Sequence, residues 1–284
     1  MKECVTVSMP CFNCRSYLKK AVSSVLSQTY TNLILVVFND ASTDAPWDVL
    51  RNIHDRRLFR FNASENQSLF FAHEVVALAT RDRYFLTHDA DDWSEPRRLE
   101  LLMRTMLEAN ADCVVSDLAV REYVNGSPHH CGIRSNARVR EPLLPNFQHR
   151  ADHHALFRKD ALRRVGGYFG GFRYGYDTLL MNLLLMTSKV EYCAAPLYNY
   201  LRRQDSLTQS PNTGKSSPAR AAVHVRLKQM FFDAYGHYSR FLDGKISSGD
   251  LSKSIRSIAA RHVASQQRIN ITAESERLKY LIYG

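Results

Sequence analysis

The chain has 284 residues, of which 45% are hydrophobic and 23% are charged, the composition of an ordinary globular protein. Lys and Arg number 38 against 28 Asp and Glu, and the resulting formal net charge of +10 favours anionic partners. Because no groove-reading motif or aromatic stacking signature accompanies this charge, we expect no nucleic acid among those partners.

Apolar strands alternate with helical patterns over the first 90 residues. Short apolar runs predict strands at 5–9, 33–38, 58–61 and 84–87. Apolar residues at helical spacing predict helices at 18–26, 47–53 and 70–79. Strands that alternate with helices form parallel sheets with right-handed crossovers, so the loops after these strands should converge on one edge. We therefore predict an α/β fold, a Rossmann-like and mostly parallel sheet flanked by helices.

Three carboxylates, those of Asp89, Asp91 and Asp92, follow the strand at 84–87 within four residues. Carboxylates this close repel one another unless a cation neutralises them, and oxygen ligands on a short turn suit Mg²⁺ or Mn²⁺. We expect Asp91, with Asp89 or Asp92, to hold such a metal. The alternative is an acidic turn that caps the next helix, since Asp92 precedes Glu95-Pro96. Both roles can coexist.

The loops Met9–Asn13, Asn39–Asp44 and Asp89–Asp92 follow three of the predicted strands. In this order they resemble the loops of the family 2 glycosyltransferases, which have the GT-A fold. The resemblance implies that the first two loops hold the nucleotide base of a sugar donor, through Pro10, Phe12 and Asp40.

The same resemblance assigns the third loop and one helix to the donor. The Asp89-Ala90-Asp91 stretch would be the DxD element, which meets the ribose and the metal-bound diphosphate. His73 stands where an Arg is expected near the donor, and Glu74 stands where an Asn is usual. We therefore include Ala90 and His73 among the expected donor contacts.

The second half of the chain contains candidates for the catalytic base and for a loop that covers the diphosphate. Tyr176-Asp177 stands where the family usually has Glu-Asp, so the resemblance implies that Asp177 is the base that removes the acceptor's proton in an inverting transfer. The alternative is that Asp177 only caps the helix predicted at 178–186. The stretch 201–208 resembles the family loop that folds over the diphosphate, with Arg203 where a His is common. An Arg can neutralise phosphate but cannot ligate a metal.

Residues 121–150 are irregular and polar in pattern, and we expect them to form a variable loop over the active site. His153, His154 and Tyr176 are expected to line an acceptor pocket, because such side chains exchange hydrogen bonds with sugar hydroxyls. The alternative for the histidines is that they are exposed or hydrogen-bonded within the protein. They lack the spacing of a zinc site.

We predict a GT-A catalytic domain at 1–217, with a nucleotide-sugar half at 1–118 and an acceptor half at 119–217. A helical C-terminal extension follows at 218–284, and its apolar stripe must be covered by the catalytic domain, by a second copy in a homo-oligomer or by a membrane surface. No apolar run reaches the roughly 20 residues that cross a bilayer, and no signal-peptide pattern is visible. We expect a cytoplasmic protein, with peripheral contact at the inner face of the membrane as the lipid-bound alternative.

The sequence therefore predicts a metal-dependent, inverting glycosyltransferase of the hexosyltransferase type that uses Mn²⁺ or Mg²⁺. Its donor would be a nucleoside diphosphate sugar, with a UDP-sugar as first candidate, and its acceptor a hydroxyl of a glycan, lipid-linked or small molecule. One alternative is a nucleotide-sugar or glycan-binding protein of the same fold without turnover. Another is a nucleotidyltransferase, although the Gly-rich phosphate loop usual in that class is not visible in the sequence.

Overall fold

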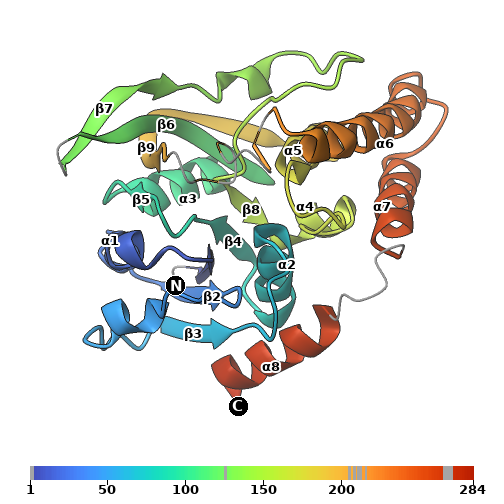
Figure 1. Ribbon diagram of the computed structural model, residues 1–284. Coiled ribbons are helices and arrows are strands. Elements are labelled where there is room, and N and C mark those ends of the chain that lie inside the picture. The colour runs from blue at the N-terminus through green and yellow to red at the C-terminus, as the bar shows by residue number, and fades with distance from the viewer. Residues whose placement is uncertain are drawn as a thin grey trace.

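The computed structural model describes residues 3–124, 127–203, 206, 209, 213–214, 216–264 and 271–284. Its strands form a sheet in the order β3-β2-β1-β4-β8-β6-β9-β5, with β7 paired to β6 beside this path (Figure 1). The strands are β1 Val5–Cys11, β2 Leu33–Asn39, β3 Leu58–Asn62, β4 Tyr84–Thr87, β5 Trp93–Ser94, β6 Cys113–Val124, β7 Ser127–Arg134, β8 Leu156–Arg158 and β9 Val190–Leu201.

Helices cover both faces of this sheet. They are α1 Arg15–Leu26, α2 Leu69–Ala79, α3 Arg98–Glu108, α4 Lys159–Arg164, α5 Tyr176–Thr187, α6 Pro218–Leu242, α7 Ser248–Ala264 and α8 Ile271–Tyr283, with 3₁₀ turns at Pro46–Leu50 and Ala137–Arg140. Successive side chains of a strand point to opposite faces, and β2 shows the result. Leu35 and Val37 join a core with α1 and α3, whereas Val36 and Phe38 join a second core with α2, α5 and the C-terminal helices. This burial on both faces explains why β2 reads as an unbroken apolar run.

The predicted α/β fold is confirmed. β1 pairs in parallel with β2 and β4, and β2 pairs in parallel with β3, so the loops after β1, β2 and β4 meet at one edge of the sheet. The remaining half is mixed, because β8 is antiparallel to both β4 and β6 while β9 is parallel to β6.

Three local predictions were wrong. Residues 121–124 and 127–134 are not irregular: they belong to the paired strands β6 and β7, and the exposed β7 carries polar side chains and so lacks an apolar pattern. The helix expected at 47–53 is a 3₁₀ turn that ends at Leu50. The sequence patterns at 190–194 and 197–200 predict two separate strands, but they form one strand, β9, whose register shifts near Pro196, where a proline can be accommodated.

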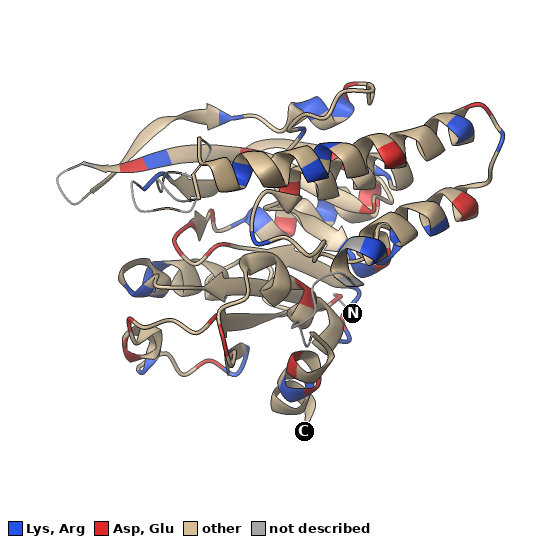
Figure 2. Cartoon of the chain, turned by 45° about the vertical axis from the view of Figure 1, so that its right-hand side comes forward, with Lys and Arg blue, Asp and Glu red and all other residues tan. Residues whose placement is uncertain are grey.

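The C-terminal helices pack on the rest of the chain. α6 lies against α5, and α8 lies far from α6, against α2 and β3 (Figure 1). Leu227, Phe231 and Leu278 of these helices are buried in the same core as α2 and α5. Within the described residues, no helix is both long enough and apolar enough to cross a membrane. Lys and Arg lie along α6 and α7 as well as in the sheet half, so the net positive charge does not belong to one element (Figure 2).

Candidate active site

A cavity of about 1760 Å³ opens where β1, β2 and β4 end. The part of the lining that follows these strands, here called the strand-end wall, consists of residues 10–14, 40, 66, 68–70 and 89–91. The part contributed by later segments, here called the far wall, consists of residues 147–149, 152–154, 173–175, 177–178, 220–221, 223–225 and 227. The cavity therefore brings together loops of the parallel sheet and segments more than 50 residues further along the chain.

The turns after β1 and β2 form the first part of the strand-end wall. Pro10 and Phe12 line the cavity, and the Phe12 side chain is exposed. Asp40 also lines the cavity but is only 3% exposed, and its carboxylate accepts hydrogen bonds from Asn66 Nδ2 at 2.9 Å and from the Gln67 amide at 2.9 Å. Burial raises the pKa of Asp40 to about 6. The three residues expected to hold a base thus share one edge of the cavity.

The three carboxylates after β4 have different partners. Asp91 Oδ2 accepts a hydrogen bond from Arg203 Nε at 2.8 Å, and Asp92 Oδ1 accepts one from the Leu201 amide at 2.7 Å. Asp89 Oδ2 lies 3.0 Å from His154 Nε2. α3 begins at Arg98 without a side-chain cap, so the alternative that this turn caps the next helix is wrong.

The pKa values of the three carboxyl groups are shifted in different directions. Burial raises the pKa of both Asp91 and Asp92, and the neighbouring carboxylates add to the effect. Burial also opposes ionisation of Asp89, yet the adjacent His154 holds the pKa of that carboxyl below its usual range. Asp92 Oδ2 is buried and has no hydrogen-bond partner in the described part of the chain.

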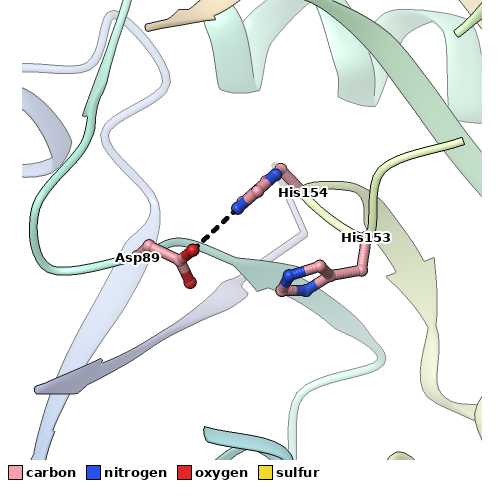
Figure 3. A group of neighbouring side chains, drawn as sticks. All are labelled: Asp89, His153 and His154. Carbon is pink, nitrogen blue, oxygen red and sulfur yellow. Dashed lines mark hydrogen bonds and ion pairs between the residues drawn. The ribbon is translucent and has the colours of Figure 1, made fainter. Parts of the chain in front are cut away.

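Two overlapping groups could hold a metal ion. Carboxylate oxygens of Asp89, Asp91 and Asp92 lie within 4.8 Å of one another. The same limit holds for the ligand atoms of Asp89, His153 and His154, whose side chains point toward one another (Figure 3). Oxygen ligands suit Mg²⁺ and Mn²⁺, and the partnerless Asp92 Oδ2 offers a further lone pair. The residues after β4 therefore fit a divalent cation.

His153 and His154 line the cavity as expected, but two other predicted contacts do not. His73 is fully buried, and its Nδ1 lies 2.9 Å from Ser8 Oγ. Tyr176 is fully buried against Phe70. The structure therefore does not bring His73 or Tyr176 to the cavity among the residues that it describes.

Glu74, the second departure in α2, has a structural partner. Its carboxylate accepts a hydrogen bond from the Tyr168 amide, and a side chain at Gly167, whose φ is +95°, would collide with it. The residue that breaks the sequence pattern therefore fixes a turn beside α4 and does not reach the cavity.

Asp177 lies in the first turn of α5 and lines the cavity. The residue that precedes this helix is Gly175, with φ of +82°, and no side chain caps it. The alternative that Asp177 only caps the helix is therefore wrong. Asp177 therefore lines the same cavity as the acidic turn, from a different segment of the chain.

Arg203 lines the cavity beside Asp91, and its guanidinium lies 4.9 Å from the Tyr17 ring. Of the loop predicted at 201–208, residues 204, 205, 207 and 208 lie outside the described residues. α6 also brings Arg220 and His224 to the cavity, a contribution that the sequence did not predict. Nothing in the sequence of α6 marks these two residues, because basic side chains are common on exposed helix faces.

The fold is that of GT-A glycosyltransferases. A crystal structure of TarS residues 1–349 from S. aureus, solved in complex with UDP, matches with a TM-score of 0.58 at 14% identity, and the match covers 99% of this chain and 88% of that TarS chain. The complex of TarS with UDP-GlcNAc matches with a TM-score of 0.57.

The model of "Glycosyl transferase family 2" matches residues 6–166, more than half of the chain. The chain belongs to this family, and it is a glycosyltransferase by class. It is 27% identical over 221 residues to the glycosyltransferase GlyA of Streptococcus pneumoniae, with 72% of this chain but only 31% of GlyA covered. It is 23% identical over 236 residues to GlyG of the same organism, with 74% of each chain covered.

A shorter match reaches a protein with a specified reaction. The chain is 30% identical over 91 residues to WfaP of Escherichia coli, a UDP-Glc:alpha-D-GlcNAc-diphosphoundecaprenol beta-1,3-glucosyltransferase, with 32% of this chain and 36% of WfaP covered. The resemblance stated from the three loops is thus confirmed at the level of family and fold.

Proposed function

We propose that this protein transfers a sugar from a nucleoside diphosphate sugar, with a UDP-sugar as first candidate, to an acceptor hydroxyl with inversion at the anomeric carbon. The observation that carries the proposal is that one cavity is lined both by the acidic turn after β4 and by Asp177. A carboxylate pair for the donor's diphosphate and a separate carboxylate for the acceptor are what a single-displacement transfer requires. UDP in the matched TarS structures and the UDP-sugar in the name of WfaP favour uridine.

Each wall then has one task. Pro10, Phe12 and Asp40 receive the base, and Asp40 accepts a hydrogen bond from it when ionised. Ala90 and Asp91 lie beside the ribose and diphosphate, and Arg203 neutralises phosphate charge. On the far wall, Asp177 takes the proton of the acceptor hydroxyl as its oxygen attacks the anomeric carbon. General-base catalysis of this kind contributes roughly 10²- to 10⁴-fold in rate.

Asp89, Asp91 and Asp92 would hold Mn²⁺ or Mg²⁺ at the diphosphate. When bound, such an ion offsets the charge that develops on the leaving nucleoside diphosphate. The protein's contribution is to keep the three carboxylates on one rigid turn, with Asp92 fixed to the β9 backbone through the Leu201 amide.

A nucleotide-sugar-binding protein without turnover is the second candidate, because donor binding needs only the strand-end wall. Asp177 favours transfer, since a carboxylate on the far wall has no role in holding a donor. The nucleotidyltransferase alternative has no support in the family match.

A thermal-shift screen of nucleoside diphosphates, with and without Mn²⁺, tests the donor assignment. UDP with Mn²⁺ should stabilise the fold well beyond either alone, by about 2.7 kcal/mol at a hundredfold excess over the dissociation constant. A larger rise in melting temperature with GDP than with UDP would change the assigned base to guanine but leave the assigned reaction unchanged. An unchanged melting temperature with every nucleoside diphosphate would exclude the proposed function.

A further inference from the structure

Two adjacent histidines reach the acidic turn from a different part of the chain. Asp89 follows β4, whereas His153 and His154 precede β8, and the three side chains converge (Figure 3). His154 Nε2 lies 3.0 Å from Asp89 Oδ2. Two ligands that bind one ion at about 2.1 Å and at a right angle are themselves about 3.0 Å apart. These two atoms form a hydrogen-bonded ion pair here, and their spacing also matches that of neighbouring ligands in a coordination shell.

The histidines are oriented by the protein around them. His153 Nδ1 lies 2.7 Å from the Tyr168 hydroxyl. When Nδ1 carries the proton and donates it to that oxygen, the lone pair on Nε2 is left for a metal, which is the usual arrangement of metal-binding histidines. The His154 ring stacks on Tyr198 with 4.3 Å between centroids. Both histidines are more than nine-tenths buried.

A separate observation points to the same place. Asp92 is 1% exposed, and its Oδ2 has no hydrogen-bond partner in the described part of the chain. This oxygen lies 3.9 Å from His154 Nε2. A buried carboxylate oxygen without a partner is costly, and a cation seated between Asp92, Asp89 and the histidines would remove that cost.

We propose that His153 and His154 are nitrogen ligands, through Nε2, of the divalent cation held at Asp89 and Asp92, and that this seat selects Mn²⁺, Co²⁺ or Zn²⁺ over Mg²⁺. Mg²⁺ prefers oxygen ligands and keeps several waters, whereas imidazole suits the transition metals. The proposal rests on the proposed function for the role of the ion, because it names the ion class that would serve the donor's diphosphate. His153 and His154, which the sequence placed in the acceptor pocket, are then ligands of the metal.

The test uses the full chain without nucleotide. Electron spin echo envelope modulation of bound Mn²⁺ should show ¹⁴N coupling from imidazole. His154→Gln and His153→Gln should each weaken Mn²⁺ binding by at least tenfold and change the ¹⁴N signal, whereas Mg²⁺ should bind the wild type at least tenfold more weakly than Mn²⁺. Tyr168→Phe should weaken Mn²⁺ binding by about 10- to 100-fold, as expected for loss of a group that orients a ligand.

His224→Gln is the matched control, because His224 lines the same cavity from α6 and is exposed. It should keep both the Mn²⁺ affinity and the ¹⁴N signal. Mn²⁺ bound to wild type without ¹⁴N coupling, or absence of Mn²⁺ binding to wild type, would overturn the proposal. The wild-type spectrum decides even if a histidine variant fails to fold.

The outcome is separable from that of the proposed function. Suppose that calorimetry shows UDP binding, but that the bound metal has only oxygen ligands or that no metal binds. The histidine ligands would then be refuted, and the donor assignment would stand. Conversely, ¹⁴N-coupled Mn²⁺ in a protein that binds no nucleoside diphosphate would support the seat and refute the donor assignment.

Discussion

The two walls of the cavity are constructed differently. The strand-end wall consists of loops that directly follow neighbouring parallel strands, so the sheet alone brings Asp40 and Asp91 together. The far wall has no common element: Asp177 comes from the start of α5, His154 from the segment before β8, and His224 from α6. Side-chain chemistry should therefore dominate the effects of substitution on the first wall, whereas packing also matters on the second. Three of the four predictions below test this contrast, and the remaining one tests the packing of the C-terminal helices.

The largest effect is expected on the far wall. Asp177→Asn removes the base and should lower kcat by about 10²- to 10⁴-fold, while donor affinity stays near that of wild type because Asp177 is not on the strand-end wall. Kinetics and calorimetry on the same preparation measure both. Asp233→Asn, an exposed change on α6, is the control. Ordinary turnover in Asp177→Asn would move the base to another residue, with Asp152 next to test.

A stability measurement examines the packing of the C-terminal helices. Leu278 of α8 is fully buried in the core that contains α2, so Leu278→Ala should cost about 2–5 kcal/mol of unfolding free energy. Leu281, in the same helix, is 47% exposed, and Leu281→Ala should stay within about 0.5 kcal/mol of wild type. Urea denaturation compares the two variants. Equal stabilities would mean that α8 is not part of the core.

On the strand-end wall, Asp91→Asn should weaken donor binding in the presence of Mn²⁺ by about 10- to 100-fold, the range for losing a charged hydrogen-bonding group. Calorimetric titration with UDP measures the change. Asp48→Asn serves as control, because Asp48 forms an exposed ion pair with Arg15 away from the acidic turn. If both variants bound UDP equally well, the acidic turn would not hold the diphosphate.

The smallest effect concerns pH. Ionised Asp40 accepts a stronger hydrogen bond from the base than the protonated carboxyl does, and burial raises its pKa to about 6. UDP affinity should therefore rise, by up to about tenfold from pH 5 to pH 7, as the ionised fraction grows. Titration of the nucleotide itself persists in Asp40→Asn, so the difference between wild type and this variant isolates Asp40. If UDP affinity changed with pH in the same way in wild type and in Asp40→Asn, Asp40 would not be the residue that binds the base.

The same pKa has the opposite sign for stability. An unfolded Asp titrates near 3.9, so the folded chain binds this proton more tightly than the unfolded chain. The stability contributed by protonated Asp40 is fully present below about pH 4 and is lost as the pH rises through about 6. The protein should thus lose some stability over the range in which it gains donor affinity.

The strand-end wall could be predicted from the sequence because each of its motifs follows an apolar strand, and parallel strands place their ends together. The placement of Asp91 and Asp40 at the cavity could therefore be predicted without information about contacts between distant segments. His73 illustrates the limit: its position in α2 matched a donor contact, but packing against Ser8 decides where the ring lies. The proximity of His154 to Asp89 arises from the antiparallel pairing of β4 with β8, which no local pattern predicts.

The positions of α6 and β7 in the fold could not be predicted from the sequence for another reason. Both elements have exposed polar faces, so their patterns carry little information about what they adjoin. The β6–β7 hairpin was predicted as irregular for this cause. His224 reaches the cavity only because α6 packs on α5, a contact between segments about 40 residues apart.

The turns after β1 and β2 are joined to each other before any donor arrives. The Thr43 amide donates to Asn13 Oδ1 at 2.9 Å, the Asn13 amide donates to Ser42 Oγ at 3.1 Å, and the Asp40 amide donates to the Cys11 carbonyl at 2.9 Å. Amides held in this way are shielded from solvent exchange until the turns open. Their hydrogens should exchange with deuterium slowly in the nucleotide-free protein, and UDP should slow them little further. The base would then meet a surface already ordered for it, with little entropy lost on docking.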